Sequence, residues 1–277
     1  MGVLKSIIKF LKGDNDARGT EICVSGGDGR KRRILYSIST IREQAISDFC
    51  GIRVLAAACA NERSRDSRAL SSDPIRQESS ILIAAVKKVG CFIETKDVPG
   101  TRYTIRTGES EVRLVQRDGL YYKIKNPFAK LHLKRHLTDC VLFEHIVHNI
   151  LFPDCRLEFL GIAEECHEAR IIYRQKAVRS ESRPDDKQIS EYLSQLKLAR
   201  CGRYEFGNEL LFVTDVGQDG DNVLLDDDGA IRFIDPIIGF KSPLVLRLKT
   251  ALVSEEDVLS LVQDLYHAEL IQTPNFN

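Results

Sequence analysis

The sequence lacks three features that would each assign it to a class of protein. Its 40 lysines and arginines are balanced by 40 aspartates and glutamates, so overall charge gives no reason to expect a nucleic-acid partner. No stretch approaches the ~18 consecutive apolar residues of a membrane-spanning helix, so we expect no membrane span. The eight cysteines form no CxxC pair and no disulfide-scaffold spacing, which favours a reducing, cytoplasmic location.

The chain of 277 residues is long enough for one large domain or two smaller ones. A polar stretch, NERSRDSRALSSDP at 61–74, separates a predicted helix over 39–60 from a second predicted helix over 74–90. The second helix ends at Gly90 in the manner of a C-cap. We place a boundary here, with 1–75 as an N-terminal accessory segment and 76–277 as the main domain.

The rest of the chain predicts an α+β protein. Between 91 and 125, four short β-rich runs alternate with Gly- and Asp-containing turns, which indicates an antiparallel meander. A long helix over about 130–151 and two further strands follow. A helix over about 185–199, an aspartate-rich hairpin and a last helix over about 254–270 complete a smaller, mainly helical part.

One carboxylate breaks the apolar pattern of the long predicted helix. The helix is apolar on two faces, and Glu144 falls in the middle of one of them. A buried carboxylate is costly unless a cation or hydrogen-bond donors meet it. The nearest candidates are Lys123 and Lys125 of YYKIK, which point to one face of the predicted sheet. An ordinary buried ion pair is the alternative to a functional one.

The most acidic segment, 214–236, holds seven aspartates and one asparagine and admits two interpretations. In the first it is an EF-hand calcium loop with Gly220 at the sixth position. The twelfth position would then be Asp226 instead of the usual glutamate, and the flanking ELLFVT and AIRFID are β-rich, whereas an EF-hand needs helices. This interpretation is the less favoured one.

In the second interpretation the carboxylates divide by position. Asp215 ends one strand, Asn222 opens the next, and a hairpin returns Asp235 toward Asn222. Residues 226–228 then lie at a solvated tip, where DDDG favours a type I′ turn. An Asn–Asp pair suits Mg²⁺ that carries phosphate oxygens, and a third carboxylate can accept a hydroxyl proton or orient an acceptor.

The order Asp215, Asn222, Asp235 resembles the catalytic core of the protein-kinase-like superfamily. More narrowly, YYKIKNPFAK, EHIVHNILFPDCRLEFLGI and NVLLDDDGAIRFIDPII closely resemble the kinase-like domain found in polyvalent proteins of phages and mobile elements. The resemblance covers roughly residues 95–240. It implies a reduced bilobal protein-kinase-like fold, with a first lobe at about 76–174 and a second at about 178–277.

The resemblance also implies roles in the first lobe for binding ATP. Lys123 would neutralise the nucleotide phosphates, and Glu144 would hold this lysine in place. Gly108 of RTGESEV would let the backbone approach the phosphates. Gln175 of YRQKAV would lie against the nucleotide, at the hinge between the lobes.

In the second lobe, Asn222 and Asp235 would coordinate Mg²⁺, and Asp215 would be the catalytic base or the acceptor-orienting residue. The family places its catalytic aspartate five residues before the metal asparagine, where this chain has Gly217. Asp215 lies seven residues before it, and Asp219 is a further candidate. Two functions therefore stay open. One is an ATP–Mg²⁺-dependent phosphotransferase acting on an unknown protein or small-molecule acceptor. The other is a pseudokinase-type nucleotide-binding or protein-interaction module without turnover.

Overall fold

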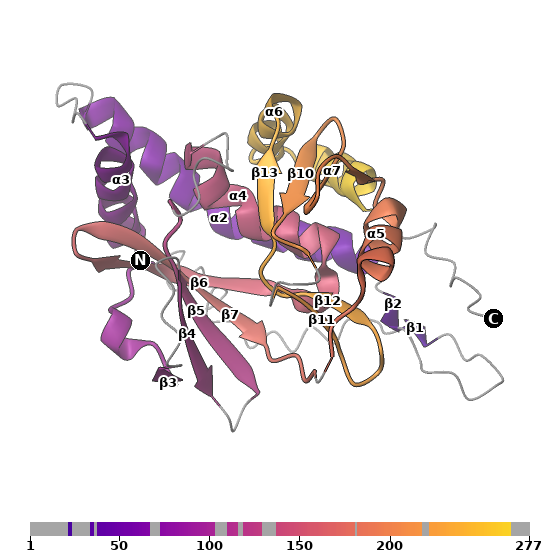
Figure 1. Cartoon of the computed structure of the whole chain (residues 1–277). Coiled ribbons are helices and arrows are strands. Elements are labelled where there is room, and N and C mark those ends of the chain that lie inside the picture. Colours follow the sequence, from indigo (N-terminus) through magenta and orange to yellow (C-terminus); the bar gives the residue numbers. More distant parts are fainter. Residues whose placement is uncertain are drawn as a thin grey trace.

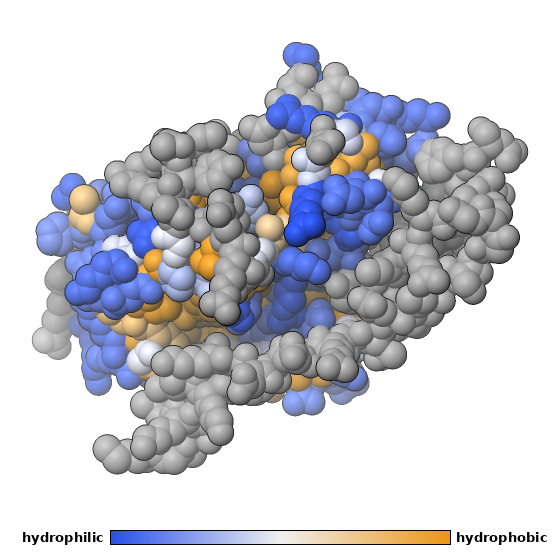
Figure 2. All heavy atoms as spheres, turned by 90° about the horizontal axis from the view of Figure 1, so that it is seen from below, coloured by the Kyte–Doolittle hydropathy of each residue, from blue (hydrophilic) through white to orange (hydrophobic). Residues whose placement is uncertain are grey.

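The computed structural model is a mixed α+β protein with antiparallel sheets and helices (Figure 1). It describes residues 22–23, 34–35, 38–66, 73–102, 110–115, 119–128, 137–180, 182–217 and 222–266. Among these residues, no helix combines the length and the apolar character needed to cross a membrane. On the face shown in Figure 2, hydrophilic residues are interspersed with apolar ones.

The larger sheet has five antiparallel strands in the order β3-β4-β5-β7-β6. They are β3 (Thr101–Arg102), β4 (Ser110–Val115), β5 (Leu120–Lys125), β7 (Glu168–Lys176) and β6 (Leu157–Glu165). A separate pair consists of β1 (Ile22–Cys23) and β2 (Ile34–Leu35). Strand β5 lies inside the larger sheet between β4 and β7, so its side chains alternate between two covered faces.

One predicted strand of the meander, at 91–97, is wrong. This segment forms a single parallel bridge, Phe92 to Ile162, followed by the 3-10 helix η1 (Thr95–Asp97). It meets β6 at a register shift, where a Cβ on Gly161 would stand 2.4 Å from the carbonyl oxygen of Cys91. The pairing of this segment with β6 is therefore limited to one bridge, and no strand forms here.

Two helices precede the sheet and pack against each other: α2 (Ile38–Asp66) and α3 (Pro74–Val89). The predicted bounds of α3 are confirmed by its caps, since the Asp73 side chain accepts two backbone N–H bonds and Gly90 adopts a left-handed φ of 78°. Helix α2 extends beyond the predicted residue 60 into the polar stretch. There Arg63 forms two hydrogen bonds with Glu78 of α3, at 2.8 and 3.1 Å.

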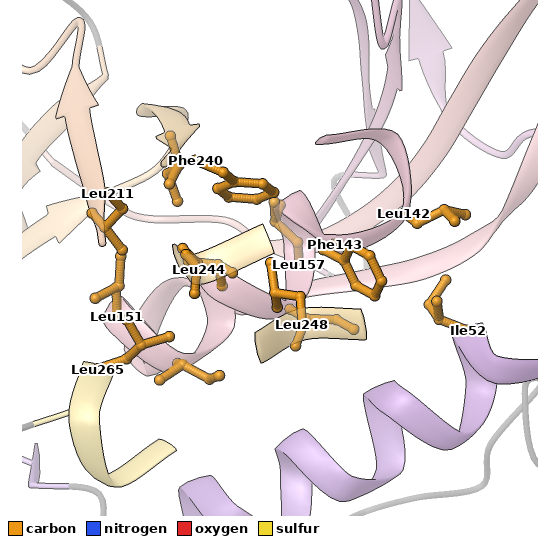
Figure 3. Packing of buried hydrophobic residues seen from close by; sticks show 14 of the residues in the cluster. Ile52, Leu142, Phe143, Leu151, Leu157, Leu211, Phe240, Leu244, Leu248 and Leu265 are labelled. Carbon is orange, nitrogen blue, oxygen red and sulfur yellow. The ribbon is translucent and has the colours of Figure 1, made fainter. Parts of the chain in front are cut away.

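Helix α4 (Leu137–Leu151) lies between α2 and the elements that follow, and every residue from 142 to 151 is buried. In Figure 3, Ile52 of α2 points toward Leu142 and Phe143 of α4. The buried side of α2 belongs to the same core as α3, α4 and the C-terminal helices; it comprises Ile41, Ala45, Phe49, Ile52, Leu55 and Cys59. The boundary near residue 75 stays a prediction, and α2 packs as part of this common core.

After residue 178 the described chain combines three helices with six short strands, so this part is less uniformly helical than predicted. Before this part of the chain, the 3-10 helix η3 (Pro153–Cys155) connects α4 to β6. The later elements are α5 (Asp186–Gln195), β8 (Ala199–Arg200), β9 (Glu205–Gly207), β10 (Leu211–Thr214), β11 (Val223–Leu225), β12 (Ile231–Phe233), β13 (Ile237–Phe240), α6 (Ser242–Ala251) and α7 (Glu255–Leu265). Strands β13, β10, β9 and β8 form one sheet in that order, and β11 pairs with β12. Helix α6 has no counterpart among the predicted elements.

The β11–β12 turn differs from the predicted type I′ turn. Asp226 and Ala230 close a three-residue loop in which Gly229 has a φ of 73°, while residues 227–228 keep negative φ. This is the longer hairpin connection with a left-handed glycine. Asp226 is not simply solvated, because it accepts two backbone N–H bonds and pairs with Arg232; residues 227–228 are exposed.

Helix α6 offers a direct test of the core. The Leu248 side chain is fully buried, whereas Leu246 on the same helix is 66% exposed. We expect Leu248→Ala to lower the free energy of unfolding by roughly 2–5 kcal/mol. Leu246→Ala should stay within about 0.5 kcal/mol of the parent protein. Urea unfolding followed by circular dichroism measures both, and equal losses would contradict the assigned packing of α6.

Candidate functional site

Strand β5 brings two lysines to the same face of the larger sheet. Tyr122 and Ile124 belong to a small cluster on one face, so Lys123 and Lys125 point to the other. Lys123 is 6% exposed; its Nζ donates a 2.6 Å hydrogen bond to the carbonyl oxygen of Ile234 and lies 3.9 Å from Asp235 Oδ1. The sheet is thereby attached to the segment that follows β12.

Lys125 lies between two carboxylates. Its Nζ is 2.8 Å from Asp235 Oδ1 and 4.0 Å from Glu144 Oε1. The predicted pair between Lys123 and Glu144 is therefore replaced, among the described residues, by a pair between Lys125 and Glu144. Period-two alternation identified both lysines, but it could not say which one lies level with the glutamate of α4.

Glu144 sits in a helix that is surrounded on all sides. Its exposure is 9%, and its neighbours Phe143 and His145 are 1% and 2% exposed. Because an uncompensated charge is costly in such a setting, the ammonium group of Lys125 matters for keeping this carboxylate inside.

The charges at the centre of the site shift the pKa values of their neighbours. Burial acts to raise the pKa of Asp235, but the ammonium groups of Lys125 and then Lys123 outweigh it and hold this pKa well below its usual range. Asp235 is therefore an anion at any ordinary pH. Burial lowers the pKa of Lys123, an effect that Asp235 opposes and Lys125 reinforces.

Two hydrogen bonds hold the segments that carry the three residues predicted from the acidic segment. The Nδ2 of Asn222 donates a 3.0 Å hydrogen bond to the carbonyl oxygen of Asp215, and the backbone N–H of Ile234 donates to the carbonyl oxygen of Asn222 at 2.8 Å. Asp235 follows directly. Since a carbonyl oxygen only accepts, the amide nitrogen of Asn222 faces Asp215 and its Oδ1 is directed away.

The chain passes Asp215 in a left-handed conformation, with a φ of 64°. Such a conformation is uncommon outside glycine and is seen most often for Asn and Asp. At Gly217 a Cβ would stand 2.3 Å from Cδ1 of Tyr204. The position five residues before Asn222 therefore has no room for an aspartate unless this ring moves, which gives a physical reason for the departure from the family spacing.

Two further residues, Gly108 and Gln175, were predicted to contact the nucleotide. Gly108 lies outside the described residues. Gln175 is 3% exposed and lies in β7 between Tyr121 of β5 and Leu157 of β6. Its Nε2 donates a 2.6 Å hydrogen bond to the carbonyl oxygen of Cys155. The side chain thus holds β7 to η3, and its contact with nucleotide stays a prediction.

The residues at the site fit a magnesium ion better than a calcium loop. No group of three or more His, Cys, Asp or Glu that could hold a metal occurs in the described ranges. Mg²⁺ is usually held by one or two carboxylates together with substrate phosphates, and ionised Asp235 is a ligand of that type. That Asn222 and Asp235 share one ion stays a prediction. The acidic loop is flanked by the strands β10 and β11, whereas an EF-hand needs helices.

Comparison with known proteins gives one match. A family model described as the serine/threonine/tyrosine kinase found in polyvalent proteins matches residues 76–242, which is more than half of the chain. The match includes the β5 lysines, α4 and the whole 214–236 segment, and it leaves out α2 and α7. No curated protein and no solved structure matches the chain.

A buried histidine beside the site makes stability depend on pH. His148 is 2% exposed, one turn after Glu144; burial first, and then Lys123 and Lys125, lower its pKa to about 4. The unfolded chain then binds the proton more readily between about pH 6.5 and 4, so stability should fall as pH falls through this window. The His148→Leu variant should therefore lose roughly 3 kcal/mol less free energy of unfolding than the parent between these pH values.

Urea unfolding at several pH values measures this difference in the free energy of unfolding. The control is His167→Leu, whose parent side chain is 97% exposed. An unchanged pH profile in His148→Leu would contradict the expectation.

Proposed function

Since the chain belongs to the family of serine/threonine/tyrosine kinases found in polyvalent proteins, we propose that it is an ATP–Mg²⁺-dependent phosphotransferase with a reduced two-lobed fold. The observation that carries the proposal is the meeting of Lys125 with Asp235 and Glu144, at 2.8 and 4.0 Å. These three side chains come from β5, the segment after β12, and α4. The acceptor would be a hydroxyl group on a protein or a small molecule.

The metal would be held by Asn222 and Asp235. Asp235 is ionised, and Asn222 offers a neutral oxygen whose direction is set by the hydrogen bond from its Nδ2 to Asp215. Magnesium bound there supplies charge neutralisation for the nucleotide phosphates. Asp235 would then contact both Lys125 and the metal.

The two lysines of β5 would have different roles, one in binding phosphate and one in anchoring the strand. Lys125 lies between Asp235 and Glu144, so it can turn toward the phosphates while Glu144 keeps it in place. Lys123, which we assigned to the phosphates from the sequence, is bonded to the carbonyl oxygen of Ile234. We therefore assign phosphate binding chiefly to Lys125. Lys123 would anchor β5 to the metal-binding segment and add positive charge.

The reaction that we propose is a direct transfer of the γ-phosphoryl group. The acceptor hydroxyl oxygen forms a bond to the γ-phosphorus as the bond from that phosphorus to the β–γ bridging oxygen breaks, and ADP leaves. The hydroxyl proton passes to the carboxylate of Asp215. Phosphoryl transfer of this kind asks the protein for positioning and electrostatic stabilisation and for little covalent chemistry.

The second candidate is a nucleotide-binding or protein-interaction module without turnover. The observation that favours it is Gly217 at the position where the family has its catalytic aspartate, with Tyr204 filling the space of a side chain there. Whether Asp215 substitutes for that aspartate decides between an enzyme and a pseudokinase.

Asp235→Asn tests the metal site. The variant keeps the shape of the side chain, which is 30% exposed, but removes its charge. Loss of a charged partner at such a site should weaken magnesium binding by roughly 30-fold. We expect isothermal titration to find that Mg²⁺ no longer strengthens ATP binding. Asp228→Asn, a charge removed from the exposed turn of the same hairpin, is the matched control. Unchanged magnesium-dependent affinity in Asp235→Asn would show that the metal is held elsewhere.

Asp215→Asn separates the two functions. If Asp215 accepts the hydroxyl proton, turnover should fall by about 100- to 10,000-fold, because that is the usual contribution of a general base. Affinity for ATP–Mg²⁺ should stay within about threefold, since the carboxylate contacts the acceptor. Radiolabelled phosphate transfer, including transfer to the protein itself, measures the first quantity. A parent protein that binds ATP–Mg²⁺ but transfers no phosphate would favour the module.

A further inference from the structure

The long helix α2 lies before the region matched by the family, yet it packs directly on the helix that carries Glu144. The family match begins at residue 76, whereas α2 ends at Asp66. Helices α2 and α4 contribute buried side chains to one core. The position of α4 therefore depends on a segment that the family domain does not include.

A polar contact joins α2 to the end of α4. Oδ2 of Asp48 accepts a 3.0 Å hydrogen bond from Asn149, and Oδ1 accepts one of 2.5 Å from Arg156. Asn149 also bonds to both backbone groups of Leu157, at 2.7 and 2.9 Å. Asp48 is only 12% exposed, and its loss would deprive both Asn149 and Arg156 of an acceptor on α2. One aspartate of α2 is thus connected to the end of α4 and the start of β6.

An apolar contact joins α2 to α4 beside Glu144. The rings of Phe49 and Phe143 are fully or almost fully buried, with centroids 6.2 Å apart. Ile52, one turn further along α2, points toward Leu142 and Phe143 in Figure 3. Because Phe143 directly precedes Glu144, a shift of α4 on α2 moves the carboxylate as well.

The distances around Lys125 make such a shift consequential. Its Nζ is 2.8 Å from Asp235 but 4.0 Å from Glu144, at the outer limit of an ion pair. A displacement of α4 of about 1 Å away from the sheet would take Glu144 beyond ion-pair distance of Lys125, while the contact of Lys125 with Asp235 would remain. The lysine would then compete with the metal for this carboxylate instead of being held ready for phosphate.

We propose that α2 is a built-in positioning element for the site, in which Asp48 and Phe49 hold α4 so that Glu144 shares Lys125 with Asp235. The proposal rests on the proposed function, and it adds positioning residues from outside the family domain. Asp48 and Phe49 act through α4 and contact no reacting group. A bound partner or ligand that moved α2 would change activity through the same contact.

The experiment uses the full chain with Asp48→Asn. This variant keeps the size of the side chain but loses one of its two oxygen acceptors. We expect kcat to fall by about 10- to 100-fold, the scale of a remote change that misplaces a catalytic group by about 1 Å. The KM for ATP–Mg²⁺ should change by less than about threefold.

The matched control is Glu78→Gln, which breaks a different ion pair of α2, the one from Arg63 to α3. Its kcat should stay within about twofold of the parent value, even where its thermal midpoint falls as far as that of Asp48→Asn. An equal loss of kcat in the two variants would show that α2 only stabilises the fold, and this would overturn the proposal.

A double variant shows whether Asp48 acts through Glu144. In a Glu144→Gln background, Asp48→Asn should lower kcat by no more than about twofold further, because the group it positions is already gone. Losses that simply multiply would overturn the proposal, as would an unchanged kcat in Asp48→Asn alone.

Hydrogen exchange tests the proposal independently of activity. Amides of residues 142–151 should exchange at least about 10-fold faster in Asp48→Asn than in the parent or in Glu78→Gln. Unchanged exchange in α4 would overturn the positioning role whether or not the protein transfers phosphate. Failure of the proposed function would appear instead as a parent protein that neither binds nor turns over ATP–Mg²⁺.

Discussion

The ion pair between Lys125 and Asp235 is the constraint on which the rest of the site depends. It is 2.8 Å long and joins an interior strand of the larger sheet to the segment between β12 and β13. Each charge also has a second partner of opposite sign, because Glu144 lies 4.0 Å from Lys125 and Lys123 lies 3.9 Å from Asp235. The second lysine, Lys123, reinforces the same junction through the carbonyl oxygen of Ile234. Sheet, hairpin and α4 are therefore arranged around a compact group of opposite charges.

Helix α4 is the element that relates these charges to the rest of the protein. It carries Glu144 toward β5 and packs on α2, and its end is tied to β6 through Asn149. Because residues 142–151 of this helix are all buried, that part cannot move without disturbing several packed surfaces. The family match begins at residue 76, so one side of α4 is covered by a helix, α2, that lies before the matched region.

Elements with local signals were predictable from the sequence. Asp73 and Gly90 marked both ends of α3, and alternation placed the two lysines of β5 on one face. The order of Asp215, Asn222 and Asp235 along three strand ends was likewise readable. In the structure Asn222 bonds to Asp215 and accepts a bond from Ile234, the neighbour of Asp235. Predictions failed where a distant contact decides the outcome. The segment at 91–97, for example, meets β6 only at a bulge. The loop at 226–230 differs for a local reason, because Asp226 bonds to Ala230 and to Arg232 of the same hairpin.

What the sequence by itself determined is therefore the type and order of the chemistry. Two cations lie on one strand, one carboxylate lies on an apolar helix, and an Asp–Asn–Asp series accompanies a hairpin, because caps, turns and alternation act over a few residues. Only the tertiary structure decided that Lys125 is the lysine that meets Glu144, that Tyr204 fills the space beside Gly217, and that α2 holds α4. These outcomes depend on how faces far apart in the chain pack together. A difference of two residues along a strand, about 7 Å, is enough to exchange one partner for another.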